Sequence, residues 1–321
     1  MKVLVAGASG AIGQPLVRRL SADQHEVFAL TQSPDSCPAL KELGAEPIIG
    51  NALDATAVKA ALERIRPDAV INELTSLPRN YTPEAMKAAA ERDRKVRVEG
   101  NMNLLATLRD AGVRRYLLQS SGFWYAPGAG LADESVPFIS SGPPGIEAGA
   151  RIYMELESRA SATRGIEFVA LRYGFFYGPR TWYTHDGDMG EQIRQRQVPI
   201  IGDGQGVYSF VHIDDAARAT AAALECEPGP YNIVDGNPLP QHVWLTAFAR
   251  AIGAPEPPRV EKEEALRRLG PDAVYYATML RGASNEKVRR ELDFRPRRLE
   301  WIQADEHSEN VAAGTKSKSG E

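Results

Sequence analysis

Three glycines near the start of the chain, Gly7, Gly10 and Gly13, have the spacing of a turn that could bind phosphate. They follow a short apolar run, residues 3–6, and precede a segment, residues 14–20, whose apolar residues recur at helical spacing. This order predicts a buried strand, a glycine turn and a helix. In such a turn the backbone can approach a pyrophosphate, and the helix N-terminus faces the anion. The pattern predicts a dinucleotide site; the alternative is a glycine turn with only a structural role.

The end of the next apolar run, residues 25–31, bears on which dinucleotide would bind. A carboxylate about twenty residues after the glycines is typical of NAD sites, where it bonds the ribose 2′-hydroxyl. Thr31 and Gln32 stand there instead, and the first acid is Asp35, beyond Pro34. The missing negative charge favours NADP(H) over NAD(H), although this loop contains no arginine to hold a 2′-phosphate.

The composition is that of an ordinary globular protein with a full hydrophobic core. Of 321 residues, 43% are hydrophobic and 25% are charged, and 38 basic against 42 acidic residues give a net charge of −4. This balance argues against a nucleic acid or an anionic membrane as partner. The densest charged run, residues 91–97, mixes both signs and is expected to be a solvated helix face.

The two cysteines, Cys37 and Cys226, have no His or Cys neighbours at metal-ligand spacing. We therefore expect neither a disulfide framework nor a metal site, and a reducing compartment fits this usage best. No apolar run is long enough for a signal sequence or a membrane span. These features predict a cytoplasmic protein.

Strand-like apolar runs alternate with helical patterns through the first half of the chain. After the first two, such runs occur at residues 45–49, 67–75, 113–121 and 167–173. This alternation predicts a Rossmann-type α/β fold, in which helices cover both faces of a doubly wound parallel sheet. We expect a Rossmann domain over 1–177, rejoined by 208–236, a smaller C-terminal substrate lobe from 178–207 and 237–303, and a disordered tail over 304–321.

Four further stretches support this assignment: residues 50–54 (GNALD), 122–125 (GFWY), 171–179 (LRYGFFYGP) and 209–216 (SFVHIDDA). With the glycine turn, they make residues 1–302 resemble the extended short-chain dehydrogenase/reductase superfamily, in its NAD-dependent epimerase/dehydratase group. The resemblance implies an oxidoreductase that uses a nicotinamide dinucleotide.

Matching the chain to the family's motifs assigns residues to the site. The cofactor-binding residues that the resemblance implies are Gly7, Gly10, Ala11, Ile12, Gly13, Thr31, Gln32, Asn51, Ala52, Leu74, Thr75, Ser120, Tyr173 and Phe175. Ser121 matches the family's catalytic Ser/Thr, which hydrogen-bonds the reacting oxygen. Ser121 also ends the predicted fifth strand, and ligands gather at the carboxyl ends of strands in this topology.

The family's catalytic Tyr-x-x-x-Lys pair is absent. Aligning Glu157 with the family's Glu puts Gly149 in the tyrosine position and Tyr153 in the lysine position, whereas aligning Tyr153 with the family's tyrosine puts Glu157 where the cation belongs, so neither register restores the pair. The plant progesterone β-reductase and iridoid synthase group also lacks this pair, but the position of its loop lysine is Phe123 here. A phenol without a cation stays protonated at neutral pH, so it can donate a proton but is a poor base. Tyr153 and Tyr125 are therefore candidate catalytic donors; alternatively, Tyr153 only packs on the cofactor.

Aromatic residues replace expected charges in the substrate lobe. Where nucleotide-sugar enzymes of the family usually offer an arginine, this chain has Tyr208, which cannot neutralise a diphosphate. The predicted substrate-binding residues are Phe123, Trp182, Tyr183, His185 and Tyr208. Residues 180–187 resemble a lid over a flat or apolar ligand. We expect His212 to be structural, and Asp214 and Asp215 to cap the helix that follows.

These features favour an NAD(P)-dependent oxidoreductase that reduces a small carbonyl or enone by hydride transfer. Two alternatives stay open: a nucleotide-sugar epimerase or dehydratase, and a dinucleotide-binding regulator without catalysis. The expected partner is a small-molecule substrate, and a homodimer is left open.

Overall fold

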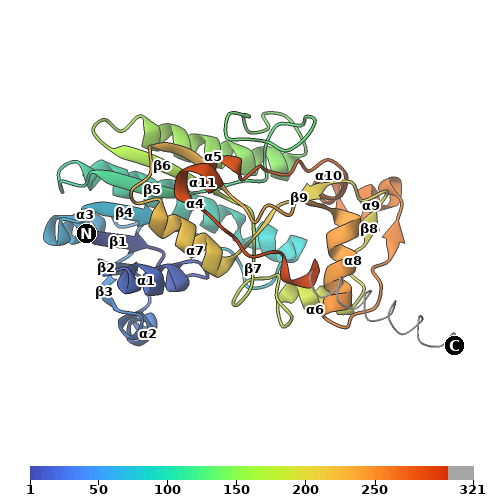
Figure 1. The fold of residues 1–321 in the computed structure, drawn as a ribbon, viewed down its shortest axis with the longest axis horizontal. Helices are drawn as coiled ribbons and strands as arrows, with labels where there is room; N and C mark the ends of the chain where they lie inside the picture. Colours follow the sequence, from blue (N-terminus) through green and yellow to red (C-terminus); the bar gives the residue numbers. More distant parts are fainter. Residues whose placement is uncertain (303–321) are drawn as a thin grey trace, which may run out of the picture.

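In the computed structural model, which describes residues 1–302, seven parallel strands form one central sheet (Figure 1). Their order is β11-β6-β5-β4-β1-β2-β3, and neighbouring strands pair in parallel. The strands are β1 (Lys2–Ala6), β2 (Glu26–Thr31), β3 (Ala45–Ile49), β4 (Ala69–Asn72), β5 (Arg115–Ser121), β6 (Glu167–Tyr173) and β11 (Gly229–Ile233). The predicted Rossmann-type fold is confirmed.

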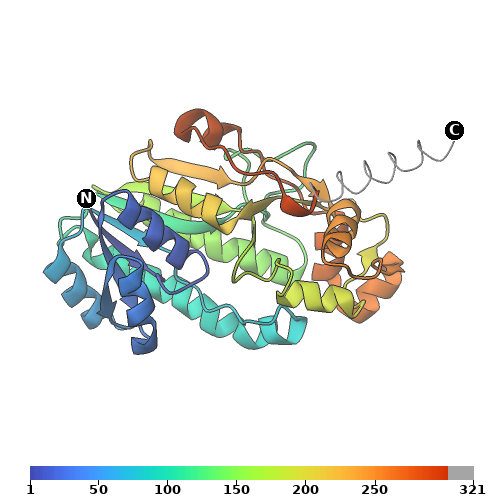
Figure 2. The same ribbon diagram turned by 60° about the horizontal axis from the view of Figure 1, so that its bottom comes forward.

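Helices cover both faces of this sheet (Figure 2). One face packs against α1 (Gly13–Ala22), α2 (Cys37–Glu42), α7 (Ile213–Ala222) and α11 (Glu286–Leu292), and the other against α3 (Ala55–Ile65), α4 (Pro83–Leu108) and α5 (Pro144–Ser161). Alternate residues of β1 enter the two cores: Val3 and Val5 enter one, and Leu4 and Ala6 the other. A strand buried on both faces must be apolar throughout, which explains the uninterrupted apolar runs.

Further helices and short strands lie beyond the sheet, with α8 (Gln241–Ala251), α9 (Lys262–Leu269) and α10 (Pro271–Thr278) at the end of the molecule opposite β1–β3 (Figure 1). They also include α6 (Asp188–Arg194). Three small strand pairs join them: β7 (Phe175–Tyr177) with β10 (Phe210–His212), β8 (Ile200–Ile201) with β13 (Arg259–Val260), and β9 (Val207–Tyr208) with β12 (Leu239–Pro240). A short 3-10 turn, η1 (Pro34–Ser36), follows β2.

One predicted boundary needs correction. The substrate lobe was expected to include all of residues 237–303, but α11 returns to the sheet and packs against β11. The predicted disordered tail, residues 304–321, lies outside the described residues.

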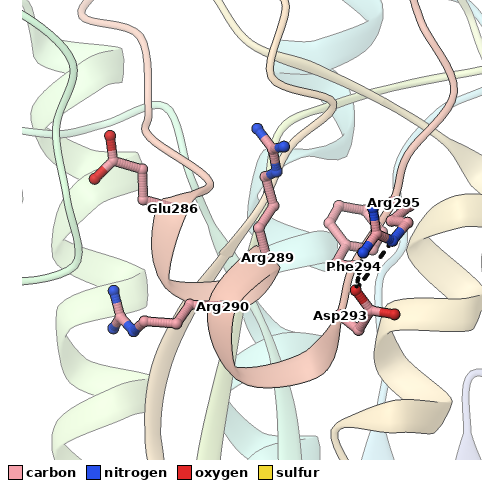
Figure 3. A pocket seen from close by; sticks show the side chains of 6 residues that line it. All are labelled: Glu286, Arg289, Arg290, Asp293, Phe294 and Arg295. Atoms are coloured by element: carbon pink, nitrogen blue, oxygen red, sulfur yellow. Dashed lines mark hydrogen bonds and ion pairs between the residues drawn. The ribbon is translucent and has the colours of Figure 1, made fainter.

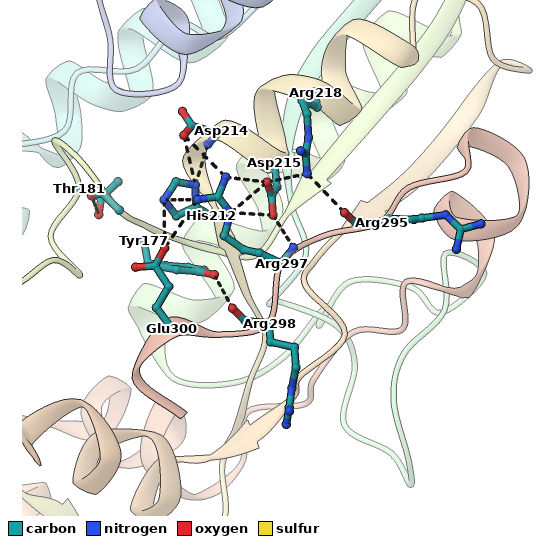
Figure 4. A network of polar contacts seen from close by, with 11 residues as sticks. Tyr177, Thr181, His212, Asp214, Asp215, Arg218, Arg295, Arg297, Arg298 and Glu300 are labelled. Atoms are coloured by element: carbon teal, nitrogen blue, oxygen red, sulfur yellow. Dashed lines mark hydrogen bonds and ion pairs between the residues drawn. The ribbon is translucent and has the colours of Figure 1, made fainter. Parts of the chain in front are cut away.

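A polar network around His212 ties the stretch that follows α11 to α7 (Figure 4). The His212 imidazole caps α7 by accepting a hydrogen bond from the Asp214 backbone at 3.1 Å. The fully buried Asp215 carboxylate instead accepts from the backbone N–H of Arg297 at 2.7 Å and from the Arg218 guanidinium at 2.7 Å. His212 is structural, as expected. The predicted capping by Asp214 and Asp215 is wrong, because both lie inside the first turn of α7.

Candidate active site

The glycine turn connects β1 to α1 at the carboxyl edge of the sheet. Gly7 has φ +88°, and a Cβ on it would lie 2.5 Å from the Glu73 carbonyl oxygen. A Cβ on Gly13 would overlap the Gly7 carbonyl. Both glycines are therefore required by the close packing of this turn. Among the described residues, a Cβ on Gly10 would meet the Gly7 carbonyl oxygen alone, at 3.1 Å, so the space on that side of Gly10 is largely open.

The N-terminus of α1 is suited to an anion. No side chain caps it, and its first turn contains no acid. The positive end of the helix dipole therefore has no competing protein anion. Arg180 adds a cation nearby, since its guanidinium donates to the Ser9 carbonyl at 3.3 Å. Gly10, Ala11 and Ile12 thus form an electropositive turn that fits a pyrophosphate.

The residues predicted at the adenosine side follow neighbouring strands: Thr31 and Gln32 at β2, Asn51 and Ala52 after β3, and Leu74 and Thr75 after β4. Ala52 and Leu74 come together at Gly100 of α4. A Cβ on Gly100 would lie 2.8 Å from the Leu74 side chain and 3.5 Å from that of Ala52. Parallel strands end at one edge of the sheet, so the fold collects these residues beside the glycine turn.

Two predicted cofactor residues use their side chains elsewhere. The Ser120 hydroxyl donates to the Glu157 carboxylate at 2.5 Å, and the Tyr173 hydroxyl donates to that of Glu73 at 2.8 Å. Both residues are buried. Both hydroxyls are thus engaged with carboxylates, so any contact of Ser120 or Tyr173 with the cofactor would use other atoms, and their cofactor role stays a prediction.

Glu73, which accepts the hydrogen bond from Tyr173, is a candidate site residue that the sequence analysis did not predict. Burial raises the pKa of this carboxyl to about 8, and within residues 1–302 its second oxygen has no hydrogen-bond partner. A single acid directly after the apolar strand β4 was the available sequence signal. A buried carboxyl with such a raised pKa is typical of a functional site.

Ser121 and Tyr125, at and just after the end of β5, differ in how their hydroxyls are hydrogen-bonded. Ser121 ends the strand, and its hydroxyl makes a long 3.4 Å contact with the Phe123 backbone N–H. The Tyr125 hydroxyl instead donates to Asn232 and accepts from Arg172 at 3.2 Å, and burial raises its pKa to about 12. Tyr125 is thus committed to a structural network, which argues against the predicted catalytic role.

Tyr153 lies on α5 beside a cation that the sequence did not reveal. The guanidinium carbon of Arg97, on α4, is 5.3 Å from the centre of the Tyr153 ring. Arg97 also pairs with Asp93 at 2.7 Å and is only 7% exposed, so the expectation of a solvated face over 91–97 is wrong at this residue. Burial raises the pKa of Tyr153, and the nearby Arg97 opposes this only in part. The phenol is therefore protonated at neutral pH and can donate a proton.

Position 149, which is the family's tyrosine position when Glu157 is aligned with the family's Glu, is filled from another segment. A Cβ on Gly149 would overlap the indole of Trp124, which comes from the loop after β5. The Trp124 indole N–H donates to the Tyr276 hydroxyl at 2.9 Å, and its ring lies 5.4 Å from that of Tyr153. No larger side chain fits at position 149 while the indole stays in place.

Aromatic rings surround Phe175, a predicted cofactor residue. Ring centres lie 4.4 Å away for Phe123, 4.8 Å for Tyr208 and 6.1 Å for Tyr183. Three of the predicted substrate-binding residues are therefore brought together around one ring. The sequence prediction missed Tyr276, whose ring centre lies 6.2 Å from that of Phe175, because it comes from an unrelated segment.

Of the other two predicted substrate-binding residues, Trp182 packs against an aromatic ring and His185 does not. Trp182 stacks on Tyr81 with ring centres 4.4 Å apart. His185 does not join the rings, since 64% of its side chain is exposed and its imidazole pairs with Asp186 at 2.6 Å. The predicted substrate contact of His185 is therefore not supported.

A separate cavity of about 300 Å³ lies along α11 and the residues after it (Figure 3). Its lining residues are Glu286, Arg289, Arg290, Asp293, Phe294 and Arg295, none of which belongs to the predicted site.

Within residues 1–302, no cluster of three or more His, Cys, Asp or Glu side chains could hold a metal ion. No helix in the same residues is long and apolar enough to cross a membrane.

Comparison with known proteins agrees with this geometry. A family model described as "NAD dependent epimerase/dehydratase family" matches residues 3–234. A 3-diazoavenalumate denitrifying reductase from a Streptomyces species is 38% identical over 306 residues, covering 94% of this chain and 98% of that protein. A 2-alkyl-3-oxoalkanoate reductase from Stenotrophomonas maltophilia is 27% identical over 287 residues, covering 84% and 81%.

A solved structure is also similar over most of the chain. It is the UDP-glucose 4-epimerase of Thermus thermophilus in complex with NAD, with 25% identity, a TM-score of 0.69 and coverage of 92% of this chain and 94% of that one. The chain belongs to the NAD-dependent epimerase/dehydratase family of extended short-chain dehydrogenases/reductases and is a nicotinamide-dinucleotide-dependent oxidoreductase.

Proposed function

We propose that this protein is an NADPH-dependent reductase of a small, planar organic electrophile. The observation that carries the proposal is the Trp124 indole in the family's tyrosine position, beside Gly149. Epimerases and dehydratases begin by oxidising an alcohol, which requires a base. A neutral, buried phenol is a poor base and a usable acid, so this site favours reduction.

The dinucleotide would be held by Gly7, Gly10 and Gly13 and supplies a hydride when bound. NADPH is favoured over NADH because no acid follows β2 at Gln32, where a carboxylate would repel the 2′-phosphate. Ser121 would hydrogen-bond the reacting oxygen. Tyr153, held between Trp124 and Arg97, would donate the proton that completes reduction of a carbonyl or enone. The name of the oxoalkanoate reductase supports a carbonyl substrate.

A second candidate substrate is an arenediazonium ion, supported by the name of the relative at 38% identity. Replacing the diazonium group by hydrogen takes one hydride and releases N₂, so no proton is needed. A site that has lost its Tyr-x-x-x-Lys pair is compatible with this chemistry. The two candidates therefore differ in whether they depend on the Tyr153 hydroxyl.

Tyr153→Phe separates the two candidates. NADPH oxidation is followed with 4-hydroxycinnamaldehyde and with 4-hydroxybenzenediazonium, using the wild type, Tyr153→Phe and Tyr275→Phe. Tyr275→Phe is the control, because the buried Tyr275 hydroxyl that it removes has no hydrogen-bond partner within the described residues. Loss of about 10²–10⁴ in rate with the aldehyde alone is the expected result for proton donation by Tyr153.

Unchanged aldehyde reduction in Tyr153→Phe would contradict proton donation by this residue. Absence of NADPH oxidation with both compounds would count against the proposed reductase. The coenzyme preference is checked by calorimetry with NADPH and NADH, and a tenfold preference for NADH would overturn that part.

A further inference from the structure

Four tyrosine side chains from distant parts of the sequence meet at the aromatic cluster around Phe175. Tyr81 precedes α4, Tyr183 follows β7, Tyr208 belongs to β9 and Tyr276 to α10. Tyr208 and Tyr276 have ring centres 6.5 Å apart, and both rings contact Phe175. The Tyr183 ring centre is 6.1 Å from that of Phe175, and Tyr81 stacks on Trp182, the residue before Tyr183. The four phenol groups therefore share one small region.

The hydroxyls in this region are poorly used by the protein. Within residues 1–302, the hydroxyls of Tyr81, Tyr183 and Tyr208 form no hydrogen bond with the protein, and none of them is among the fully enclosed polar atoms that lack a partner, so they are open to solvent. The Tyr276 hydroxyl accepts from Trp124 at 2.9 Å, and its own proton stays available for donation. Hydroxyls that reach solvent and have no protein partner are free to donate to and accept from a ligand. Several of them in one place indicate a site for a ligand oxygen.

The group that these hydroxyls fit is neutral. Burial keeps the pKa values of all four phenols high, so each can both donate and accept at neutral pH. Within the described residues, no lysine or arginine contributes to the pKa of Tyr81, Tyr183 or Tyr208. A buried phosphate or carboxylate would lack a compensating cation there. A phenolic hydroxyl, which also donates and accepts, matches the site.

The shape of the surroundings indicates an aromatic ring behind that hydroxyl. Phe123 and Phe175 stack with ring centres 4.4 Å apart, and rings are favoured next to such faces. Trp124 links the cluster to the reaction centre, since it bonds Tyr276 and contacts Tyr153. One planar molecule could therefore reach from the tyrosine hydroxyls toward Tyr153.

We propose that Tyr81, Tyr183, Tyr208 and Tyr276 form a specificity site for the phenolic hydroxyl of an aromatic substrate. This inference rests on the proposed reductase function, because it names the class of substrate for that site. The electrophilic group of the substrate lies at the Tyr153 end, and the phenol lies at the tyrosine end.

The test measures binding, so it does not depend on turnover. The protein is saturated with NADP⁺, which cannot reduce an aldehyde, and titrated by calorimetry with 4-hydroxycinnamaldehyde, 4-methylcinnamaldehyde and 4-carboxycinnamaldehyde. The methyl compound matches the hydroxyl compound in size but cannot hydrogen-bond. We expect the hydroxyl compound to bind at least tenfold more tightly than the other two.

Variants then assign the difference to the tyrosines. Tyr183→Phe and Tyr208→Phe each should weaken binding of the hydroxyl compound about two- to tenfold, the effect of one hydrogen bond, and leave the methyl compound unchanged. Tyr275→Phe, next in sequence to Tyr276, should change neither. Thermal melting of each variant confirms that it is folded.

Three results would overturn the specificity site. The first is that the wild type binds the hydroxyl and methyl compounds equally, or binds neither. The second is that the difference in affinity between these two compounds is the same in Tyr183→Phe and Tyr208→Phe as in the wild type. The third is that the carboxyl compound binds more tightly than the hydroxyl compound. Failure of the reductase proposal is recognised separately, because it appears as absent NADPH oxidation while this binding preference persists.

Discussion

Alanine at position 149 would put a methyl group where the Trp124 indole lies. Its Cβ would be 2.7 and 2.8 Å from two ring carbons, Cζ3 and Cζ2, against 3.4–4 Å in ordinary contact. The indole cannot move away without losing its 2.9 Å hydrogen bond to Tyr276. Overpacking of this kind costs about 1–3 kcal/mol, and alanine in place of glycine inside a helix gains about 0.5–1 kcal/mol. We expect Gly149→Ala to lower the free energy of unfolding by about 1–2 kcal/mol.

A double-mutant cycle with Trp124→Leu tests the cause. Without the indole, Gly149→Ala keeps only its helix-forming advantage and should stabilise the protein by about 0.5–1 kcal/mol. The change in the free energy of unfolding caused by Gly149→Ala therefore reverses its sign, and the coupling energy between the two positions is about 2 kcal/mol. Guanidinium denaturation of the wild type, both single variants and the double variant measures it. An equal effect of Gly149→Ala in both backgrounds would refute the idea that the indole fills the tyrosine position.

Three further predictions concern the cofactor turn, the substrate class and the buried acid. Gly10→Asp should abolish NADP(H) binding by calorimetry while circular dichroism stays unchanged, because the new carboxylate faces the pyrophosphate and the backbone there is open; undiminished affinity would reject this role of the turn. UDP-glucose and dTDP-glucose at micromolar concentration should leave the melting temperature unchanged, because Tyr208 offers no cation to a diphosphate; a clear upward shift would indicate binding to the native state. Burial raises the pKa of Glu73 from 4.5 to about 8, so the folded state holds this proton more tightly than the unfolded state. The protonated Glu73 carboxyl therefore contributes fully to the free energy of unfolding below about pH 4.5, and this contribution is lost as the pH rises through 8. Glu73→Gln removes this titration, so denaturation midpoints should fall less between pH 5 and pH 8 than in the wild type, and equal slopes would contradict the assignment.

Some of the cofactor site could be predicted because the relevant signal is local. The strand, the glycines and α1 are consecutive in sequence, and the space at Gly13 is limited by the turn itself, although that at Gly7 is limited by the distant Glu73 carbonyl. Thr31, Ala52 and Leu74 stand at or after the ends of strands whose parallel order the alternating pattern implies, so their common edge could be predicted while their contact with a cofactor stays a prediction. The bonds from the Ser120 and Tyr173 hydroxyls to carboxylates could not be predicted, because the alternating pattern of a strand does not specify hydrogen-bond partners.

The catalytic part of the site could be predicted only in outline. Tyr153 was identified, but its cation was not, because Arg97 stands in a charged run that is typical of a solvent-facing helix. Only the packing of α4 on α5 buries this one arginine beside the phenol. Similarly, the missing tyrosine at Gly149 was visible in the sequence, but the Trp124 indole that replaces it was not.

Residue type at short spacing was sufficient to predict the fold class, a glycine turn typical of dinucleotide binding and the absence of a Tyr-x-x-x-Lys motif on the expected helix. The tertiary structure alone decided which phenols are free and which are bonded. Tyr125 and Tyr183 are both buried tyrosines that follow strands, yet one is held by Asn232 and Arg172 while the other joins three phenols from distant segments. Hydrogen-bond partners and nearby charges lie across the fold, so no local pattern can specify them.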